Sequence, residues 1–382
     1  MAFVDGAMSS FMAYRNVRQQ PARTAATLAS TGFAILLVFM QLGFSQTARR
    51  AHTLLFEMLD FDLMVTSDRF ESLKNVRDFP ASRLYQVRAV PGVAAASGLN
   101  VEWARWLDPD TETASSCMVV GLDLDSAFVR DPVARRQLEA LRRGNCVLVD
   151  TLSHPDYGPV IRGRTVRLNA VNVTIAGVFR LGTDFKADGR AWMSNTTFRA
   201  VVHQEADRLS MGMVKLQPGA PVGAVRDALT RALPPDVLVF DRETFVRQEQ
   251  DYYTQVKPIG LFFQAGVVVA FCVGAVILFQ VLATDIATRF AEFATMKAIG
   301  LTHRFIYAIG FQQALIYGVC SYLPALLLAS AIFASVARAT RLPIGMDLPL
   351  AALVFVLSIA MCAVSSLLAL RRVRKADPAD LF

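Results

Sequence analysis

Four long stretches of this 382-residue chain contain no Asp, Glu, Lys or Arg. They span residues 24–48, 258–284, 305–337 and 348–370. Each exceeds the roughly 20 residues that a helix needs to cross about 30 Å of hydrocarbon. Strands of a membrane β-barrel would be about 10 residues long and would alternate in polarity. The sequence therefore predicts an α-helical membrane protein with four transmembrane helices, and it excludes a purely soluble enzyme and a disordered chain.

The positive charge is concentrated in the short segments beside these stretches. Segments 1–23, 285–304 and 371–382 together hold ten Lys and Arg residues, against two in 338–347. Lys and Arg in short loops favour the cytoplasmic side, so we place both ends of the chain and 285–304 in the cytoplasm. Segment 47–257, with 27 basic and 26 acidic residues, then lies outside. No basic cluster interleaves with aromatic residues, so we expect no nucleic-acid partner.

The expected architecture is four membrane helices with an inserted α+β external domain. Its parts in chain order are an N-terminal cytoplasmic arm (1–23), transmembrane helix 1 (24–46), the external domain (47–257), transmembrane helix 2 (258–284), a cytoplasmic helical loop (285–304), transmembrane helix 3 (305–337), a short external loop (338–347), transmembrane helix 4 (348–370) and a basic cytoplasmic tail (371–382).

Two of these assignments have alternatives. The first stretch also fits a cleaved signal peptide, but residues 41–46 do not resemble a small-residue cleavage site, so we favour an uncleaved anchor. The third stretch contains Pro324 and is long enough for two helices. No polar turn divides it, and a fifth crossing would place the basic tail outside. We therefore prefer one helix kinked at Pro324.

The external segment mixes strand and helix signals. The sequence predicts strands at 61–66, 146–149, 165–168, 171–179, 213–216 and 237–240, a hairpin of 101–106 with 117–120, and helices near 83–87, 133–143, 221–232 and 243–253. Asp131-Pro132 marks the start of the second helix as a cap followed by proline. Cys117 and Cys146 also lie here, where oxidation is possible, and a disulfide between them stays open.

The sequence lacks the common motifs for nucleotide hydrolysis, metal binding and nucleophilic catalysis. There is no Gly-x-x-x-x-Gly-Lys-Ser/Thr loop, so we expect no ATP hydrolysis by that route. The four histidines lack metal-ligand spacing, and Ser153-His154-Pro155-Asp156 is better interpreted as a polar turn than as a triad. The membrane stretches hold no ionisable relay. We therefore expect no catalytic residue, no cofactor and no metal site.

The loop at 285–304 carries the most informative pattern. Asp285 and Arg289 are spaced i,i+4 in the favoured order, and Gly300 is a natural helix end. An apolar ridge is formed by Phe290, Phe293 and Met296, and two charged residues, Glu292 and Lys297, lie beside it. Such a short amphipathic helix suits docking into a groove on a partner protein, or lying on the lipid interface. The residues alone do not decide between docking on a protein and lying on the lipid interface.

Residues 292–300 resemble the coupling segment of FtsX-like ABC transporter permeases of the MacB and lipoprotein-release type. One span, a large external domain, three spans and a basic tail with Asp377-Pro378 are similar to that family's layout. Phe293 and Ala294 stand where Ile-Gly is usual in the MacB pattern. Four further segments resemble the DevC branch, in which the ATPase is a separate subunit: 39–44, 83–86, 156–159 and 182–189.

The resemblance implies a non-catalytic permease subunit in the inner membrane of a diderm bacterium. It implies a homodimer of this chain in membrane lipid, a cytoplasmic ABC ATPase, a periplasmic adaptor (membrane fusion protein) and a TolC-like outer-membrane protein. ATPase motion would drive export through the periplasmic domain. The expected ATPase-coupling residues are Arg289, Glu292, Phe293, Met296, Lys297 and Gly300.

Two alternatives share this layout. One is a lipoprotein-releasing permease, and the other is an FtsX-like regulator that transports nothing and controls a periplasmic hydrolase. The sequence does not name the cargo, so glycolipid, lipid, peptide and small molecule all remain open.

Overall fold

The computed structural model describes residues 21–184, 187–252, 258–288 and 303–374. Internal contacts divide the chain into two compact units. The first comprises Met1–Ser45, Leu261–Ser335 and Ile344–Phe382, and the second comprises Gln46–Gly260 and Val336–Pro343. Three of the division points fall within continuous helices, after Ser45, after Gly260 and after Ser335.

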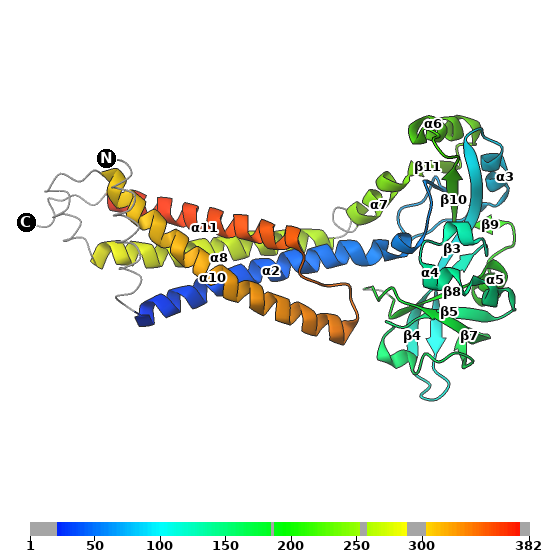
Figure 1. The fold of residues 1–382 in the computed structure, drawn as a ribbon, viewed down its shortest axis with the longest axis horizontal. Coiled ribbons are helices and arrows are strands. Elements are labelled where there is room, and N and C mark those ends of the chain that lie inside the picture. The colour runs from blue at the N-terminus through cyan, green and yellow to red at the C-terminus, as the bar shows by residue number, and fades with distance from the viewer. Residues whose placement is uncertain (1–20, 185–186, 253–257, 289–302, 375–382) are drawn as a thin grey trace, which may run out of the picture. The chain divides into compact units, whose positions relative to one another are not determined.

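Among the described residues, four helices are long and apolar enough to cross a membrane. They are α2 (Pro21–Met58), α8 (Pro258–Thr288), α10 (His303–Thr340) and α11 (Leu348–Arg374) (Figure 1). The first of them, α2, continues twelve residues beyond residue 46, where the predicted span ends. The helix α10 runs unbroken through Pro324, so the preference for one helix over 305–337 is confirmed.

Small residues allow the helices of the first unit to approach closely. A Cβ atom at Gly43 of α2 would lie 2.2 Å from the ring of Phe333 on α10. A Cβ atom at Gly274 of α8 would lie 2.4 Å from the sulfur of Met361 and 2.7 Å from Ala34. This is the packing expected between helices in lipid, where association depends on close contact more than on burial from water.

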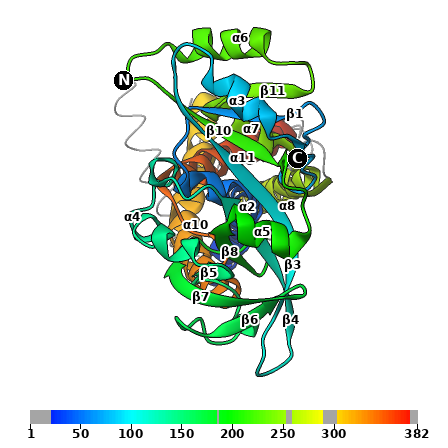
Figure 2. The ribbon, with the colours of Figure 1, turned by 90° about the vertical axis from the view of Figure 1, so that its right-hand side faces the viewer.

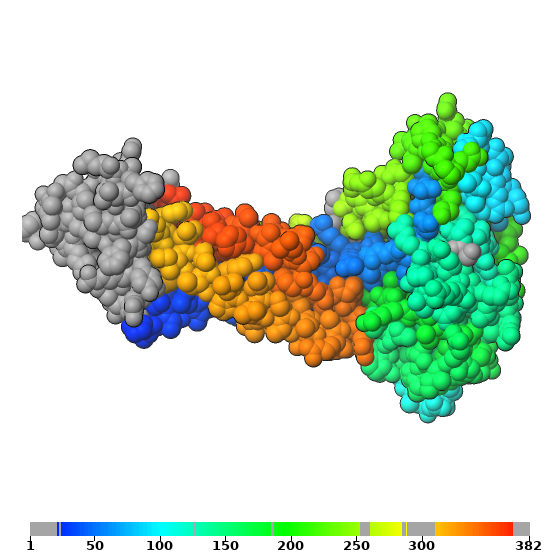
Figure 3. All heavy atoms as spheres, in the orientation of Figure 1, coloured from blue at the N-terminus to red at the C-terminus, as the bar shows by residue number. Residues whose placement is uncertain are grey.

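Hydroxyl groups add polar contacts between the same helices. Ser321 Oγ donates to the carbonyl of Leu28 at 3.1 Å, and the Tyr322 hydroxyl donates to the carbonyl of Ala351 at 2.8 Å. The second bond joins α10 to α11, which run side by side (Figures 1 and 3). Large apolar side chains cover the outward faces of the helices, as at Phe262, which is 73% exposed.

The second unit is built on a sheet of nine strands within the described residues, in the order β11-β1-β10-β3-β4-β8-β5-β7-β6. Its strands are β1 (Leu63–Ser67), β3 (Val93–Leu107), β4 (Ala114–Leu122), β5 (Cys146–Asp150), β6 (Thr165–Leu168), β7 (Val171–Phe179), β8 (Gly189–Ser194), β10 (Met211–Leu216) and β11 (Val237–Asp241). A separate pair is formed by β2 (Phe79–Pro80) and β9 (Arg208–Leu209). The helices are α3 (Ser82–Arg88), α4 (Pro132–Arg135), α5 (Asn195–Val202), α6 (Val222–Ala232) and α7 (Arg242–Asp251), with 3-10 turns at Ser126–Phe128, Leu138–Arg142 and Pro155–Tyr157.

One lobe of this unit has a split β-α-β arrangement. The elements β1, α3, β3, β10, α6 and β11 occur in this order along the chain, with the strands β4 to β9 between β3 and β10. Their four strands pair antiparallel as β11-β1-β10-β3. The helices α3 and α6 pack on one face of the strands around Val65, Leu84 and Leu229 (Figure 2). The opposite face packs against the end of α2 through Met64, Met213 and other members of the largest core cluster.

The other lobe is a closed barrel. Each strand in the series β3-β4-β8-β5-β7-β6 pairs with the next one. The last strand, β6, also pairs with β3 at Trp106↔Leu168 and closes the barrel. Trp106 stacks on Tyr157 inside it, with ring centroids 4.6 Å apart. Because β3 is 15 residues long, it serves both lobes and joins them.

Two parts of the external domain differ from expectation. The helix predicted over 133–143 starts as expected, because Asp131 accepts a hydrogen bond from the N–H of Ala134 at 2.6 Å. It ends after one turn, because the Gln137 side chain bonds both the N–H and the carbonyl of Val178 on β7. A 3-10 turn, Leu138–Arg142, then follows. The strand β8 and the helix α5 were not predicted.

The possible disulfide between Cys117 and Cys146 is absent, since both thiols are free and buried. Alternate residues of a strand point to opposite faces of its sheet. Cys117 lies with Val119 in the barrel core, whereas Cys146 lies with Leu148 in the cluster on the other face. The sheet itself therefore separates the two sulfur atoms.

Candidate functional site

The expected ATPase-coupling residues lie outside the described residues; they are Arg289, Glu292, Phe293, Met296, Lys297 and Gly300. The neighbouring helix α8 ends at Thr288, four residues past the charge-free stretch 258–284. The functional candidate that the structure describes lies in the second unit, near the C-terminal ends of α2 and α10. It is the place where α2 enters the external domain, and we call it the helix–domain junction. It is formed by Ala51–Met58 of α2, the loop at 180–184, Arg190, Arg242 and the end of α10, all in the second unit.

Arg190 of β8 forms the centre of the junction. Its side chain is 1% exposed and donates to three oxygens. These are the carbonyl of Gly182, the carbonyl of Ala51 on α2 at 3.2 Å, and Asp184 Oδ2 at 3.1 Å. The carboxylate of Asp184 is 2% exposed, so this is a fully buried ion pair. A buried guanidinium needs such partners, because an unpaired charge in the interior is very costly.

The loop that Arg190 holds is fixed from its other side by Asp150. The carboxylate of Asp150, at the end of β5, accepts hydrogen bonds from Leu181 N at 3.0 Å and from Gly182 N at 2.6 Å. Gly182 has φ +112°, which L side chains rarely adopt, and its Cβ position lies 3.4 Å from the carbonyl of Arg341. The glycine therefore permits the turn.

The same loop bonds the end of α10. Thr183 Oγ1 donates to the carbonyl of Thr340 at 3.0 Å, and Thr183 N donates to the carbonyl of Arg341 at 3.4 Å. Arg341 has φ +59° and terminates the helix. These carbonyls are among those that a helix end leaves without an internal partner. One loop of the external domain is thus bonded to α10 directly and to α2 through Arg190.

Arg242 holds the C-terminal end of α2 in a second way. It begins α7, and it donates to the carbonyls of Phe56, of Leu59 at 3.0 Å and of Phe61 at 3.4 Å. Its guanidinium carbon also lies 4.4 Å from the centroid of the Phe61 ring. A cation is favourable at a helix C-terminus, where carbonyl dipoles converge. Burial, and then the nearby cation of Arg130, lower the pKa of Arg242 from its ordinary value.

An aromatic cluster supports this second contact. Phe245 of α7 is fully buried and lies 4.9 Å from Phe56, 5.7 Å from Phe70 and 6.4 Å from Phe61, measured between ring centroids. Tilted and edge-on pairs of this kind add to the burial of apolar area. The end of α2 and the helix α7, which precedes α8 in the chain, therefore share one core.

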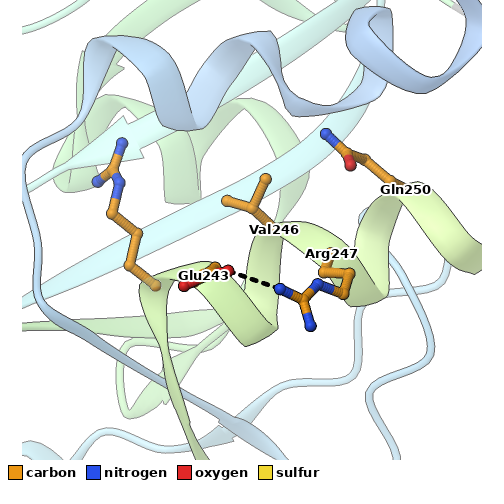
Figure 4. Close-up of a pocket in the computed structure, with 5 residues that line it drawn as sticks. Glu243, Val246, Arg247 and Gln250 are labelled. Carbon is orange, nitrogen blue, oxygen red and sulfur yellow. Dashed lines mark hydrogen bonds and ion pairs between the residues drawn. The ribbon is translucent and has the colours of Figure 1, made fainter. Parts of the chain in front are cut away.

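The outer side of α7 borders an open hollow of about 520 Å³. Figure 4 shows Glu243 and Arg247 joined by an ion pair of 2.6 Å, with Val246 and Gln250 beside them. No nucleophile or metal-ligand set lines the hollow. Across the described parts of the chain, no group of three or more His, Cys, Asp or Glu is placed to hold a metal ion.

Two family models match the chain. The MacB-like periplasmic core domain matches residues 24–232, and the FtsX-like permease C-terminal domain matches residues 265–378. The chain belongs to the FtsX/MacB-type permeases. These are membrane permeases of ABC systems, generally non-catalytic, and they act with a partner ATPase component.

Solved structures with similarity cover about half of the chain. One is the extracellular domain of the noncanonic ABC-type transporter YknZ from Gram-positive bacteria, with 12% identity, a TM-score of 0.35, and coverage of 47% of this chain and 98% of that one. Another is the periplasmic region of MacB from Actinobacillus actinomycetemcomitans, with 10% identity, a TM-score of 0.35, and coverage of 50% and 94%. No curated protein matches the chain.

The junction contains part of segment 182–189, which resembles the DevC branch in sequence. Residues 182–189 contain Gly182, Thr183 and Asp184, the three loop residues that bond the end of α10 or Arg190. Arg190 and Arg242 were not predicted as site residues. The available signals were an arginine directly after 182–189 and an arginine directly after the helix cap Asp241.

Proposed function

We propose that this chain is the membrane subunit of an ABC exporter, and that the helix–domain junction carries motion from the membrane helices to the periplasmic domain. The observation that carries the proposal is the double fixation of α2. Arg190 and Arg242 both bond its backbone carbonyls, and the loop bonded to Arg190 also bonds the end of α10.

In this proposal the four helices cross the inner membrane, with both chain ends and 285–304 in the cytoplasm and 47–257 in the periplasm. The distribution of Lys and Arg supports this orientation. The exposed apolar side chains of the helices support contact with lipid, as at Leu327 and Phe262, which are 71% and 73% exposed.

Force would enter through the segment at 285–304, where the six coupling residues contact the ATPase. ATP binding closes the ATPase pair and moves this segment, and with it the membrane helices. Nucleotide can shift the permease only by favouring one of two states over the other. Close-packed interiors transmit strain, so a displaced α2 would carry the junction and the sheet behind it.

The proposed assembly follows the resemblance to the DevC branch. It contains two copies of this chain, a separate ATPase, a periplasmic adaptor and a TolC-like duct, and it moves cargo from the periplasm outward. Recovery of an adaptor with the full-length chain supports export, whereas recovery of a hydrolase activator supports the regulatory alternative.

The test places spin labels on the two lobes of the periplasmic domain in the full-length complex with its ATPase, held in nanodiscs. Tyr85→Cys on α3 and Asn172→Cys on β7 of the barrel are suitable, because both side chains are exposed, Tyr85 by 72%. The exposed Cys272 and Cys320 are replaced by Ala. We expect the distance between the labels to change when vanadate traps the nucleotide.

The junction variants decide the result. Arg242→Met should abolish the nucleotide-dependent distance change while ATP binding persists, because α2 loses its bonds to α7. The matched control is Arg247→Met on the same helix, where the side chain is 65% exposed. A full nucleotide response in Arg242→Met, or none in the unaltered complex, would contradict the proposal.

A further inference from the structure

An arginine-rich surface lies on the barrel lobe beside the junction. It consists of the exposed residues Arg136, Arg143, Arg162 and Arg180 with two exposed apolar side chains, Val133 and Ile161, and we call it the arginine face. Val133 is 53% exposed and Ile161 is 60% exposed. The proposed transport mechanism assigns no role to this surface.

The Gln137 side chain joins the parts of this face. Its Nε2 donates to the carbonyls of Val133 at 2.8 Å and of Val178 at 2.7 Å, and its Oε1 accepts from Arg162 at 2.8 Å. The turn after α4, the end of β7 and the segment at 161–162 are therefore neighbours. Arg180 follows Val178 by two residues, just after β7 ends at Phe179.

The face is locally cationic although its domain is nearly neutral. Segment 47–257 has 27 basic and 26 acidic residues. Nearby arginines are neutralised, as Arg142 pairs with Glu139 at 2.7 Å and Arg130 pairs with Asp60 at 3.3 Å. Within the described residues, no carboxylate forms an ion pair with any of the four arginines of the face. An anionic surface would complement it.

A hydrogen bond places the face near the end of α10. Thr183, three residues after Arg180, bonds the end of α10 at Thr340. That point is three residues, or about 5 Å of helix, past Ala337, the last residue of a charge-free stretch. The headgroup layer is roughly 5–8 Å thick on each side of the hydrocarbon.

We propose that the arginine face binds the anionic headgroups of the membrane leaflet on its own side, with Val133 and Ile161 entering the headgroup region. The inference rests on the membrane placement in the proposed function. Arginine suits this role because its planar guanidinium binds phosphate through paired hydrogen bonds and is weakly hydrated. Cations beside exposed apolar residues are typical of surfaces that lie on membranes.

The same binding accounts for four arginines on the side where a positive charge is least expected. Arg49 and Arg50 follow the first charge-free stretch, and Arg338 and Arg341 follow the third. An acidic protein partner would satisfy the charges of the face, but it would not explain why cations also mark both helix exits. Anionic headgroups explain both sets.

The test uses the full chain with Ile161→Trp in nanodiscs of brominated phosphatidylglycerol or brominated phosphatidylcholine. Bromine quenches a nearby indole, and the three native tryptophans, Trp103, Trp106 and Trp192, provide a constant background that is measured without the substitution. We expect stronger quenching in the anionic lipid, and we expect the excess to decline as the salt concentration rises, because salt screens exposed charges.

Charge removal then identifies the surface. Arg136→Gln, Arg143→Gln, Arg162→Gln and Arg180→Gln together should bring the quenching ratio of the two lipids close to unity, since each cation near an anionic surface strengthens binding roughly fivefold. The control makes the same change at four exposed arginines elsewhere on the domain, Arg69, Arg77, Arg105 and Arg231.

Equal quenching in both lipids, or an excess that survives removal of the four arginines, would overturn the inference. Loss of the excess in the control variant as well would also overturn it, because the effect would then come from net charge alone. The spin-label experiment on the junction does not use these residues for coupling, so the two proposals can fail separately.

Discussion

The two units of this chain solve the same packing problem with different residues. In the first unit, helices approach through Gly43 and Gly274, and the hydroxyl of Ser321 bonds a backbone carbonyl of another helix. In the second unit, the core is filled by large rings such as Phe245, and charged groups such as Arg190 are buried in pairs.

The difference follows from the solvent that we propose for each unit. In hydrocarbon, apolar burial gains little, so close backbone approach holds helices together. In water, burial of apolar area drives folding, and rings contribute most. Buried charges cost much in either setting, and this chain places its buried Arg–Asp pair where the loop at 180–184 approaches α2 and α10. The comparison implies that the second unit is sensitive to lost charge partners and the first to added volume.

The largest effect should come from Arg190→Met. This change removes the guanidinium that pairs with Asp184 at 3.1 Å and leaves the buried carboxylate without that partner. Loss of one member of a buried pair costs about 3–5 kcal/mol. Urea unfolding of the full chain, followed by tryptophan fluorescence, measures this, because Trp103, Trp106 and Trp192 all lie in the second unit.

Asp184→Asn added to Arg190→Met should recover part of that loss, since no unpaired charge then remains. If Asp184→Asn lowers the stability of Arg190→Met as much as it lowers the stability of the unaltered chain, the pair does not act as a unit. Such a result would weaken the contrast between the two regions.

In the first unit, Gly43→Leu should destabilise the bundle by about 1–3 kcal/mol, the usual cost of excess volume in a packed core. The ring of Phe333 occupies the space that the new side chain needs. Reaction of the buried Cys362 thiol with a fluorogenic maleimide during heating reports bundle opening, after Cys272 and Cys320 are replaced by Ala.

Gly345→Leu is the matched control in the same unit, because no atom lies within 4 Å of its Cβ position. Adding Phe333→Ala to Gly43→Leu should restore stability. Equal shifts for Gly43→Leu and Gly345→Leu would mean that close approach at Gly43 does not hold the bundle.

Glu249 offers a pH-dependent test of the second unit. It is fully buried on α7, and Leu73 N donates to both of its carboxyl oxygens, at 3.0 and 3.2 Å. Burial raises the pKa of Glu249 to about 8, against the smaller opposite effect of the Leu73 hydrogen bond. The folded state therefore keeps a proton that the unfolded state has lost. The stabilisation is complete below the unfolded pKa, which is about 4.3, and it is lost as pH rises through about 8.

The expected slope for this group is up to about 1.4 kcal/mol per pH unit inside that window. Glu249→Gln should remove this slope from urea unfolding curves and should be more stable than the unaltered chain above pH 8. An unchanged pH profile in the variant would show that Glu249 does not titrate between the two states.

The sequence predicted the elements with strong local patterns and missed those that depend on distant partners. The strands β6 and β7 have the predicted bounds, and the four long helices are present, because alternation and uninterrupted apolar runs are local signals. The strand β8 was missed because it carries Arg190, and arginine is almost never fully buried unless it is paired. Its burial depends on Ala51, 139 residues away in the sequence.

The candidate site shows the same limit. The segment 182–189 was noticed by resemblance, but nothing in its sequence indicates that it bonds the end of α10 directly and α2 through Arg190. Closure of the barrel by β6 and β3 rests on pairing across 62 residues at Trp106↔Leu168. The predicted coupling residues, from Arg289 to Gly300, remain a prediction because they lie outside the described residues.

The smallest effect should come from the exposed ion pair beside the hollow on α7. Arg247 and Glu243 are 65% and 82% exposed, so water and salt screen their attraction. Arg247→Met should change the stability of the second unit by less than about 0.5 kcal/mol in the same urea assay. This value sets the baseline for Arg190→Met, because both changes remove one guanidinium from an ion pair. A large loss of stability in Arg247→Met would mean that burial does not distinguish the two arginines. The junction would then be no more important for holding α2 than an exposed ion pair.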